Sequence, residues 1–287
     1  MSTEQPAASQ RADQPLIGQV VVVTGASAGI GAAAAQAFSR AGAELAIVGR
    51  SLDKTAAVAA RVRATPFVCD FARLEDVRRL AAMLQDRYPR IDVLANNAGM
   101  LSRRRELSAD GHELTFQVNH LAPFLLTNLL SPCLGAGSRV IQTSSRAQFI
   151  GYVNRRDLES RRFYLPFQVY GTTKLENVLF TTELQRRWGE RGVSAAAFHP
   201  GTVRTEFGRQ GGISDILYTT WLGDLVLLPP ERGADTLVWL ATTTPGSDWV
   251  PGGYYAKRRR FTPSAQARRA ALARWLWDRS AELVGLR

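Results

Sequence analysis

Long apolar runs, cysteine and lysine are scarce in this chain of 287 residues, and each scarcity excludes a class of protein or site. No apolar run reaches the roughly 18 to 20 residues that a membrane-spanning helix needs, and the first fifteen residues lack the basic and then apolar order of a secretory signal. Cys69 and Cys133 have no CxxC or His-paired spacing, so neither a disulfide framework nor a zinc site is supported. We therefore expect a cytoplasmic protein with no membrane span and no metal.

Acidic residues are also few relative to basic ones, and the formal net charge is +11. A balance this basic can indicate nucleic-acid binding. Much of the local excess, however, falls in short runs at residues 103–105, 257–260 and 268–269, and such runs are usually solvated surface. We therefore expect no nucleic-acid partner.

Apolar runs that alternate with helical patterns predict the fold class. Four consecutive valines at residues 20–23 are typical of a strand buried on both faces, and a glycine loop at 24–31 leads from them into an Ala-rich helix at 32–40. Because strands and helices alternate, we predict an α/β fold with a doubly wound parallel sheet and helices on both faces. Further strands are expected at 44–48, 67–69, 91–95, 139–143 and 195–198, with an amphipathic helix over 167–188.

No linker, repeat or low-complexity segment interrupts residues 16–287, and 45% of the residues are apolar, which is ample for a core. We therefore expect a flexible polar tail over residues 1–15 and a single domain over 16–287. A last helix is expected around residues 264–285.

The glycine loop after the first expected strand favours a dinucleotide. Glycine lets the backbone approach a pyrophosphate closely, and the free N–H groups and dipole of the following helix favour an anion. A tight strand-to-helix turn without a ligand is the weaker alternative. The loop residues expected to contact the cofactor are Gly25, Ser27, Gly29, Ile30 and Gly31.

The end of the second expected strand indicates which dinucleotide binds. In such folds an acidic side chain at this place holds the ribose of NAD, whereas a basic one accommodates a 2′-phosphate. Residues 48–51 contain no carboxylate, and the Arg50 guanidinium suits bidentate contact with a phosphate. We therefore predict NADPH/NADP+ as the cofactor.

A tyrosine and a lysine form a second constellation. Tyr170 and Lys174 are four residues apart and so share one face of a helix. A nearby ammonium lowers the pKa of a tyrosine from near 10, so that it can exchange a proton closer to neutral pH. Upstream, Ser145 follows the strand expected at 139–143, at the edge where such sheets bind ligands. Taken alone, the Tyr170–Lys174 pair could arise by chance, and Ser145 could be an ordinary serine in a turn. Together with the preceding dinucleotide loop, the three residues indicate a catalytic site.

Together these motifs resemble the short-chain dehydrogenase/reductase family, which has a Rossmann-type fold, over nearly the whole chain. The glycine loop matches the family's Thr-Gly-x-x-x-Gly-Ile-Gly pattern, Asn-Asn-Ala-Gly at 96–99 matches its fourth-strand motif, and residues 200–205 match its loop beside the nicotinamide. Stretches at 110–121, 174–180 and 276–283 are similar to its retinol-dehydrogenase-like branch.

The resemblance implies a role for each matching residue. Tyr170 is the acid/base, Lys174 lowers its pKa and binds the nicotinamide ribose, Ser145 steadies the substrate oxygen and Asn119 holds a proton-relay water. Asp70 would lie at the adenine edge. Further cofactor contacts are implied for Phe71, Asn97, Ala98, Gly99, Tyr170, Pro200, Val203 and Thr205.

Two segments bear on the substrate. The 24 residues between Ser145 and Tyr170 include Asp157, Leu158 and Tyr164, as in that branch, and are expected to border the substrate cleft. Residues 207–228 are largely apolar and lie where the family has a substrate lid, which suits a bulky lipophilic or polycyclic carbonyl compound. An ordinary core helix is the equally open alternative for this second segment.

The resemblance implies an NADPH-dependent ketoreductase with a small-molecule carbonyl substrate. The overall likeness extends to ketoreductases that act on anthracycline side chains in antibiotic biosynthesis. Two alternatives stay open, a retinoid or steroid alcohol dehydrogenase and a non-catalytic NADP(H)-binding regulator that uses its basic tail. A homo-oligomer also stays open, since Trp275 and Trp277 would either face a partner subunit or cover the core of a monomer.

Overall fold

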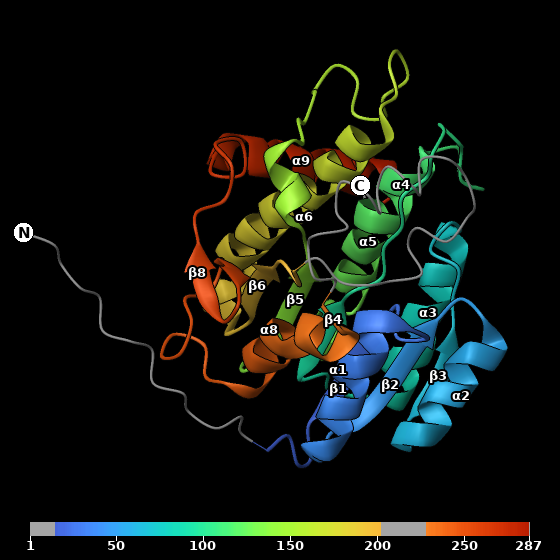
Figure 1. Ribbon diagram of the computed structural model, residues 1–287, viewed down its shortest axis with the longest axis vertical. Coiled ribbons are helices and arrows are strands. Elements are labelled where there is room, and N and C mark those ends of the chain that lie inside the picture. Colours follow the sequence, from blue (N-terminus) through green and yellow to red (C-terminus); the bar gives the residue numbers. More distant parts are fainter. Residues whose placement is uncertain (1–14, 202–227, 287) are drawn as a thin grey trace, which may run out of the picture.

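A sheet of eight strands runs through the part of the chain that the computed structural model describes, residues 15–201 and 228–286 (Figure 1). The strand order is β3-β2-β1-β4-β5-β6-β7-β8, and all neighbours are parallel except β7 and β8. The strands are β1 Val20–Thr24, β2 Glu44–Gly49, β3 Thr65–Val68, β4 Val93–Asn96, β5 Arg139–Thr143, β6 Ser194–Phe198, β7 Tyr254–Ala256 and β8 Arg259–Phe261.

Helices flank this sheet on both faces (Figure 1). On one face lie α1 (Gly29–Arg40), α2 (Leu52–Val62) and α8 (Pro230–Thr242). On the other lie α3 (Leu74–Arg87), α5 (Ala122–Leu129), α6 (Pro166–Trp188) and α9 (Ala270–Leu283). The remaining short elements are α4 (Leu114–Phe116), the π-helical turn η1 (Gln117–Leu121), and the 3-10 turns η2 (Ser131–Cys133), η3 (Arg146–Phe149) and η4 (Gly189–Arg191).

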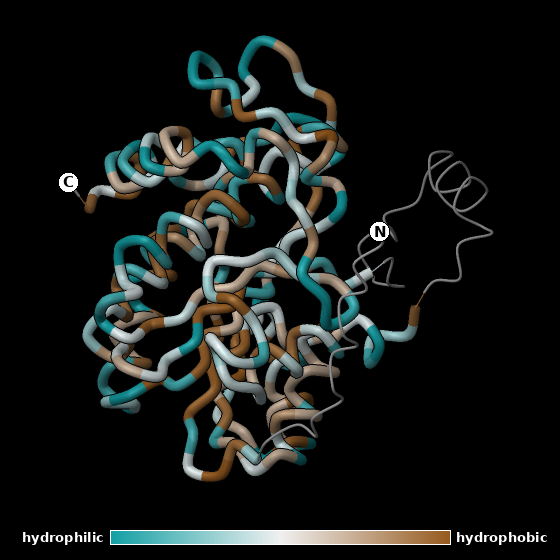
Figure 2. Tube along the Cα trace, turned by 90° about the vertical axis from the view of Figure 1, so that its left-hand side faces the viewer, coloured by the Kyte–Doolittle hydropathy of each residue, from teal (hydrophilic) through white to brown (hydrophobic). Residues whose placement is uncertain are grey.

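The valine run of β1 shows why both faces are covered. Val22 packs into the cluster beneath α3, α5 and α6, whereas Val21 and Val23 pack into the cluster beneath α1, α2 and α8. Successive side chains of a strand point to opposite faces, so a strand with helices on both sides needs apolar residues at every position. Figure 2 shows hydrophobic segments gathered in the interior of the molecule and hydrophilic ones mainly on its outer turns. The predicted Rossmann-type, doubly wound α/β fold is thus confirmed.

Most predicted elements lie within a few residues of the observed ones. β5 has the predicted bounds, and α6 begins one residue before the predicted position. β3 begins at Thr65, two residues early, because Pro66 is tolerated in a strand at the edge of the sheet. β4 begins and ends slightly later than predicted, and α1 begins at Gly29 rather than at residue 32. The helix α8 and the strands β7 and β8 were not predicted.

The last helix is shorter than predicted, since α9 begins at Ala270 rather than near residue 264. The residues before it form hydrogen bonds with η3 and with the segment that follows η3. Ser264 N–H donates to Gln148 Oε1 at 3.0 Å, and Gln266 Oε1 accepts the Val153 N–H at 2.9 Å. Residues 207–227 of the expected lid lie outside the described part of the chain.

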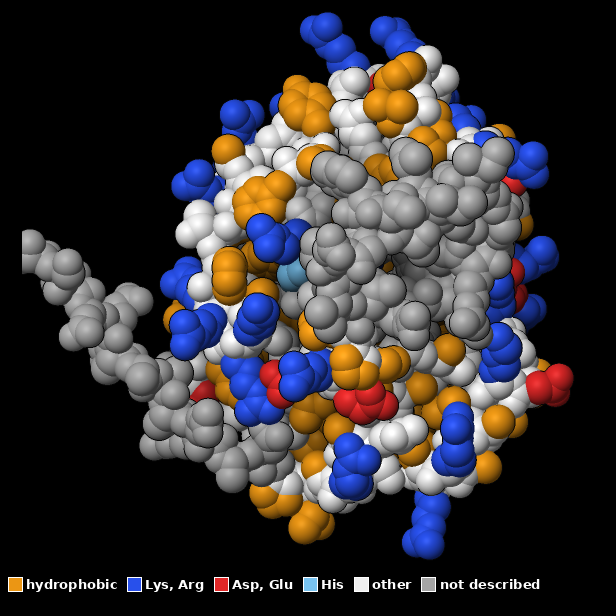
Figure 3. Space-filling model, in the orientation of Figure 1, with side chains coloured by type: hydrophobic (Ala, Val, Ile, Leu, Met, Phe, Trp, Pro, Cys, Tyr) orange, Lys and Arg blue, Asp and Glu red, His pale blue; other side chains and the backbone are white. Residues whose placement is uncertain are grey.

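The surface and the helices bear on two further expectations. Within residues 15–201 and 228–286, no helix has the length and apolar character needed to cross a membrane. Lys and Arg side chains are scattered over the face seen in Figure 3, among hydrophobic and uncharged ones. Arg258, in the late basic run, pairs with Asp235 through Nε at 2.9 Å from Oδ2.

Candidate active site

The carboxyl ends of four consecutive parallel strands bring the predicted site segments to one edge of the sheet. Strands β1, β4, β5 and β6 are neighbours, and the glycine loop, residues 97–99, Ser145 and Pro200 each follow one of them. The strand order reverses between β1 and β4, and open α/β sheets bind ligands outside such a reversal. The structure therefore brings the segments predicted to bind the cofactor close to those predicted to carry catalysis.

Thr24, to which the sequence alone assigned no role, joins the glycine loop to the loop at residues 97–99. Thr24 Oγ1 accepts the N–H groups of Asn97 and Ala98 at 3.0 and 3.1 Å. In return, Asn97 Nδ2 donates to Thr24 O at 3.0 Å. A polar residue that ends an otherwise all-valine strand was the available signal. Thr24 holds the glycine loop against residues 97–99.

The glycine loop has the geometry that a pyrophosphate needs. Gly25 and Gly29 have positive φ angles of 64° and 56°, and a Cβ at Gly25 would lie 2.7 Å from Ala98 Cα. The N-cap residue of α1, Ala28, offers no side-chain hydrogen bond, and no acidic residue stands in the first helical turn. The N–H groups of this turn are therefore directed at an approaching anion with no side-chain cap in the way, so these residues fit a dinucleotide phosphate.

The predicted adenosine contacts lie at the ends of β2 and β3. Arg50 is exposed and directly follows β2, and Gly49 packs so closely that a Cβ there would lie 3.0 Å from Ser27 Cβ. The Cys69 N–H donates to Gly49 O at 3.0 Å, which places Asp70 beside the same strand end. Asp70 Oδ1 accepts the Ala72 N–H at 3.0 Å. A guanidinium is thus the charged group that follows β2 beside the glycine loop.

Tyr170 and Lys174 lie together on α6, as their spacing predicted. Lys174 Nζ is 5.3 Å from the centre of the Tyr170 ring and donates to Thr143 O, at the end of β5, at 3.1 Å. The lysine is buried, and this burial lowers its pKa to about 8. A Cβ at Gly99 would lie 3.2 Å from Lys174 Nζ, so glycine lets the loop after β4 reach the lysine.

Asn119 lies in the π-helical turn η1, a kind of turn that is frequent at functional sites. Its side chain is fully engaged by the protein. Oδ1 accepts the Met100 N–H at 2.7 Å, and Nδ2 donates to Met100 O at 2.8 Å and to Thr173 Oγ1 at 3.0 Å. Asn119 therefore joins the loop after β4 to α6, immediately beside Lys174.

The two serines after β5 have different surroundings. Ser144 is buried, and its Oγ donates to Lys174 O at 2.7 Å. Ser145 is half-buried at the start of η3, where its Oγ accepts the Ala147 N–H at 3.2 Å and keeps its own proton to donate. Of the two serines, Ser145 is the one whose hydroxyl proton is not used in these contacts, and it stays the residue predicted to meet the substrate.

The remaining predicted residues are placed as follows. Pro200 follows β6 and is half-buried, Phe71 is buried, and Val203 and Thr205 lie outside the described residues. His199, expected to be a packed loop residue, has its pKa lowered to about 4 by burial, and its Nδ1 accepts the Arg146 N–H at 3.3 Å. A neutral, packed histidine is consistent with that expectation.

Known proteins are similar to this chain in sequence and structure. Residues 19–212 match the family model described as short chain dehydrogenase. A protein of Streptomyces sp. (strain C5) assigned as a daunorubicin C-13 ketoreductase is 44% identical over 277 residues, 94% of this chain and 94% of that protein. Retinol dehydrogenase 13 of Homo sapiens is 38% identical, over 94% of this chain and 85% of its own length. The crystal structure of a blue fluorescent protein from a metagenomic library, in complex with NADPH, matches with a TM-score of 0.68 and 26% identity, over 85% of this chain and 98% of that one.

Proposed function

Because this chain belongs to the short-chain dehydrogenase/reductase family and is an oxidoreductase acting on CH–OH/C=O groups, we propose that it is an NADPH-dependent ketoreductase of a bulky lipophilic or polycyclic carbonyl compound. The observation that carries the proposal is the pairing of Tyr170 and Lys174 on α6, against which η3, the turn that Ser145 caps, packs closely. A guanidinium and no carboxylate stands directly after β2. In this proposal one domain, residues 16–287, supplies both the cofactor site and the substrate site.

The proposed roles follow from the contacts. The bound cofactor supplies a hydride to the carbonyl carbon. Tyr170 donates its phenolic proton to the developing alkoxide, and Ser145 Oγ donates a hydrogen bond to the same oxygen that strengthens as charge grows. The Lys174 ammonium, 5.3 Å from the centre of the Tyr170 ring, stabilises the phenolate that remains. Since the Asn119 side chain is engaged by Met100 and Thr173, we assign the relay water to the main chain of η1.

The cofactor preference is assigned to Arg50. Its position after β2 is where the 2′-phosphate of NADPH would lie, and a guanidinium binds a phosphate through two parallel hydrogen bonds. The similar fold that was crystallised with NADPH supports this assignment. Gly25, Ser27, Gly29, Ile30 and Gly31 would bind the pyrophosphate, and Asp70, Phe71, Asn97, Ala98, Gly99, Pro200, Val203 and Thr205 would make the other cofactor contacts.

The substrate class is supported by the relative assigned as a daunorubicin C-13 ketoreductase, which is similar along nearly its whole length. We therefore propose the side-chain ketone of an anthracycline, in antibiotic biosynthesis, as the first substrate to try. A retinoid or steroid alcohol is the second candidate, favoured by the similarity to retinol dehydrogenase 13.

The two candidates are separated by the direction of the reaction. Purified protein would be given matched ketone and alcohol pairs of anthracycline, steroid and retinoid type, with NADPH for reduction and NADP+ for oxidation. The proposal expects faster reduction with an anthracycline ketone. Faster oxidation of a retinoid or steroid alcohol would favour the second candidate instead.

A further inference from the structure

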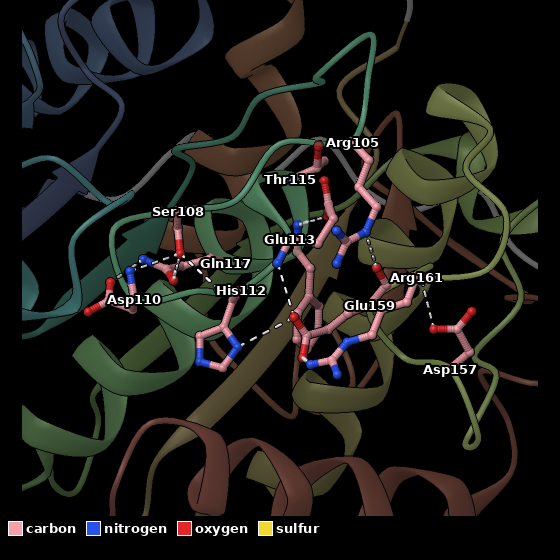
Figure 4. Close-up of polar contacts among 11 residues, drawn as sticks. Arg105, Ser108, Asp110, His112, Glu113, Thr115, Gln117, Asp157, Glu159 and Arg161 are labelled. Carbon is pink, nitrogen blue, oxygen red and sulfur yellow. Dashed lines mark hydrogen bonds and ion pairs between the residues drawn. The ribbon is translucent and has the colours of Figure 1, made fainter.

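We propose that Glu113 is a positioning residue of the proposed ketoreductase site, a buried carboxylate that, with Tyr164 and Glu159, fastens the segment between Ser145 and Tyr170 to the segment that carries Asn119. This inference rests on the proposed function, because it concerns how the substrate cleft of that enzyme is kept in shape. Figure 4 shows Glu113 and Glu159 at the centre of a cluster of polar side chains.

The Glu113 carboxylate is 0% exposed, yet three donors reach it. It caps the short helix α4, since Oε1 accepts the Thr115 N–H at 2.9 Å and Oε2 accepts the Phe116 N–H at 2.6 Å. The Tyr164 hydroxyl lies 3.2 Å from Oε1 and 3.0 Å from Ser102 O, and shares its proton between them. One carboxylate therefore orients α4 and binds a residue 51 positions further along the chain.

A second carboxylate of the same segment, Glu159, contacts the main chain of Glu113 (Figure 4). Glu159 Oε2 accepts the Glu113 N–H at 3.1 Å and lies 3.6 Å from His112 Nδ1. Its Oε1 accepts from Arg161 Nη2 at 3.2 Å, and its main-chain oxygen accepts from Arg105 Nε at 3.3 Å. The close approach of the His112 ring holds the pKa of Glu159 down at about 2, so this carboxylate stays charged.

The two fastened segments carry the proposed catalytic groups at their ends. One segment begins at Ser145, shortly after β5 ends, and enters α6 at Pro166, two residues after Tyr164 and four before Tyr170. It forms the yellow-green loops at the top of Figure 1. The other continues from Glu113 through α4 directly into η1, which holds Asn119. Ser145 and Tyr170 flank the first segment. In this proposal, loosening the contact of that segment with Glu113 widens the space between the Ser145 and Tyr170 side chains.

A third carboxyl group, Glu176 on α6, lies near Glu113. Glu176 is fully buried, and within the described residues neither of its carboxyl oxygens has a hydrogen-bond partner. Burial, and then the nearby Glu113, raises the pKa of Glu176 well above its ordinary value. Burial also raises the pKa of Glu113, whereas the N–H groups of Thr115 and Phe116 act to lower it. Of these two carboxyl groups, Glu113 is the one with donors around it, so it is the one that orients Tyr164 and α4.

The test removes a single oxygen from this contact. Tyr164→Phe deletes the hydroxyl that bonds Glu113, and Tyr152→Phe, an exposed tyrosine in the same segment, is the matched control. Hydrogen–deuterium exchange of peptides covering residues 102–117 and 155–165 measures the contact itself. Steady-state kinetics with an anthracycline ketone give KM, and titration with NADPH gives the cofactor affinity. These two quantities measure what the contact does for the site.

We expect Tyr164→Phe to speed exchange in both peptides and to raise KM about tenfold, the effect of losing one buried hydrogen bond, with NADPH affinity unchanged. Tyr152→Phe should alter neither. Unchanged exchange would overturn the fastening, and faster exchange with unchanged KM would overturn the positioning role. A wild-type protein that reduces no carbonyl compound would instead refute the proposed function, and the exchange data would then decide on the contact alone.

Discussion

The two sides of the candidate site hold their loops with different kinds of polar group. On the cofactor side, the loops after β1 to β4, the joining residues are Thr24 and Asn97, both neutral. On the substrate side, residues 102–117 and 145–176, the joining residues include Glu113, Glu159 and Lys174, all buried. Neutral hydroxyl and amide groups keep their hydrogen bonds at any ordinary pH, whereas a buried charge must be paired or must shift its pKa. The contacts that join the loops on the cofactor side should therefore be insensitive to pH, whereas those on the substrate side should respond to changes of charge and pH.

The largest effect that separates the two sides is expected from Tyr170→Phe. Loss of the proton donor should lower kcat by about 10² to 10⁴, the usual contribution of general acid catalysis. NADPH affinity, measured by fluorescence titration, should stay close to that of the wild type, because Lys174 keeps its bond to Thr143 O. Retained turnover would refute the proton-donor role.

Arg50→Asp should weaken NADPH binding without altering the substrate side. Replacing a guanidinium by a carboxylate at the expected 2′-phosphate should raise the dissociation constant for NADPH about 10- to 100-fold and affect NADH far less. Arg61→Asp, an exposed arginine on α2, makes the same charge change away from this strand end and serves as the control. Equal effects of the two variants on NADPH would mean that Arg50 does not bind the phosphate.

The smallest effect concerns the stability of the substrate side. The pKa of Glu176 is raised in the folded protein, so its contribution to stability is greatest below the ordinary carboxyl pKa and is lost as pH rises toward the folded value. Glu176→Gln keeps a neutral side chain at every pH, and should match the wild type near pH 4. Near pH 8 it should be more stable than the wild type in urea unfolding, by about 1.4 kcal/mol for each unit by which folding raises the pKa of Glu176, up to the pH of the measurement.

The exposed Glu190, changed to Gln, is the control for this measurement and should give no such pH-dependent difference. A stability difference between Glu176→Gln and the wild type that is the same at both pH values would contradict the account of a buried carboxyl group whose pKa is raised by folding.

The same division explains what the sequence could predict. The glycine loop, Arg50 and the Tyr170–Lys174 pair are local patterns, in which a few neighbouring residues determine both the backbone and the chemistry. Tyr164 and Glu113 are 51 residues apart, and Asn119 and Thr173 are 54 apart, so no spacing reveals that they meet. β7 and β8 are three residues each, too short for a periodic signal. The cofactor side was therefore largely predictable, whereas the fastening of the substrate side became visible only in the folded chain.

The central claim, that this chain reduces a carbonyl compound with NADPH, is tested most directly by the rate of NADPH oxidation at 340 nm. The purified protein would be mixed with an anthracycline that bears a side-chain ketone, and the same mixture with NADH would be followed in parallel. We predict ketone-dependent turnover with NADPH and much slower turnover with NADH. Tight NADPH binding without turnover on this or any other ketone or aldehyde would contradict the claim and favour a non-catalytic cofactor-binding protein.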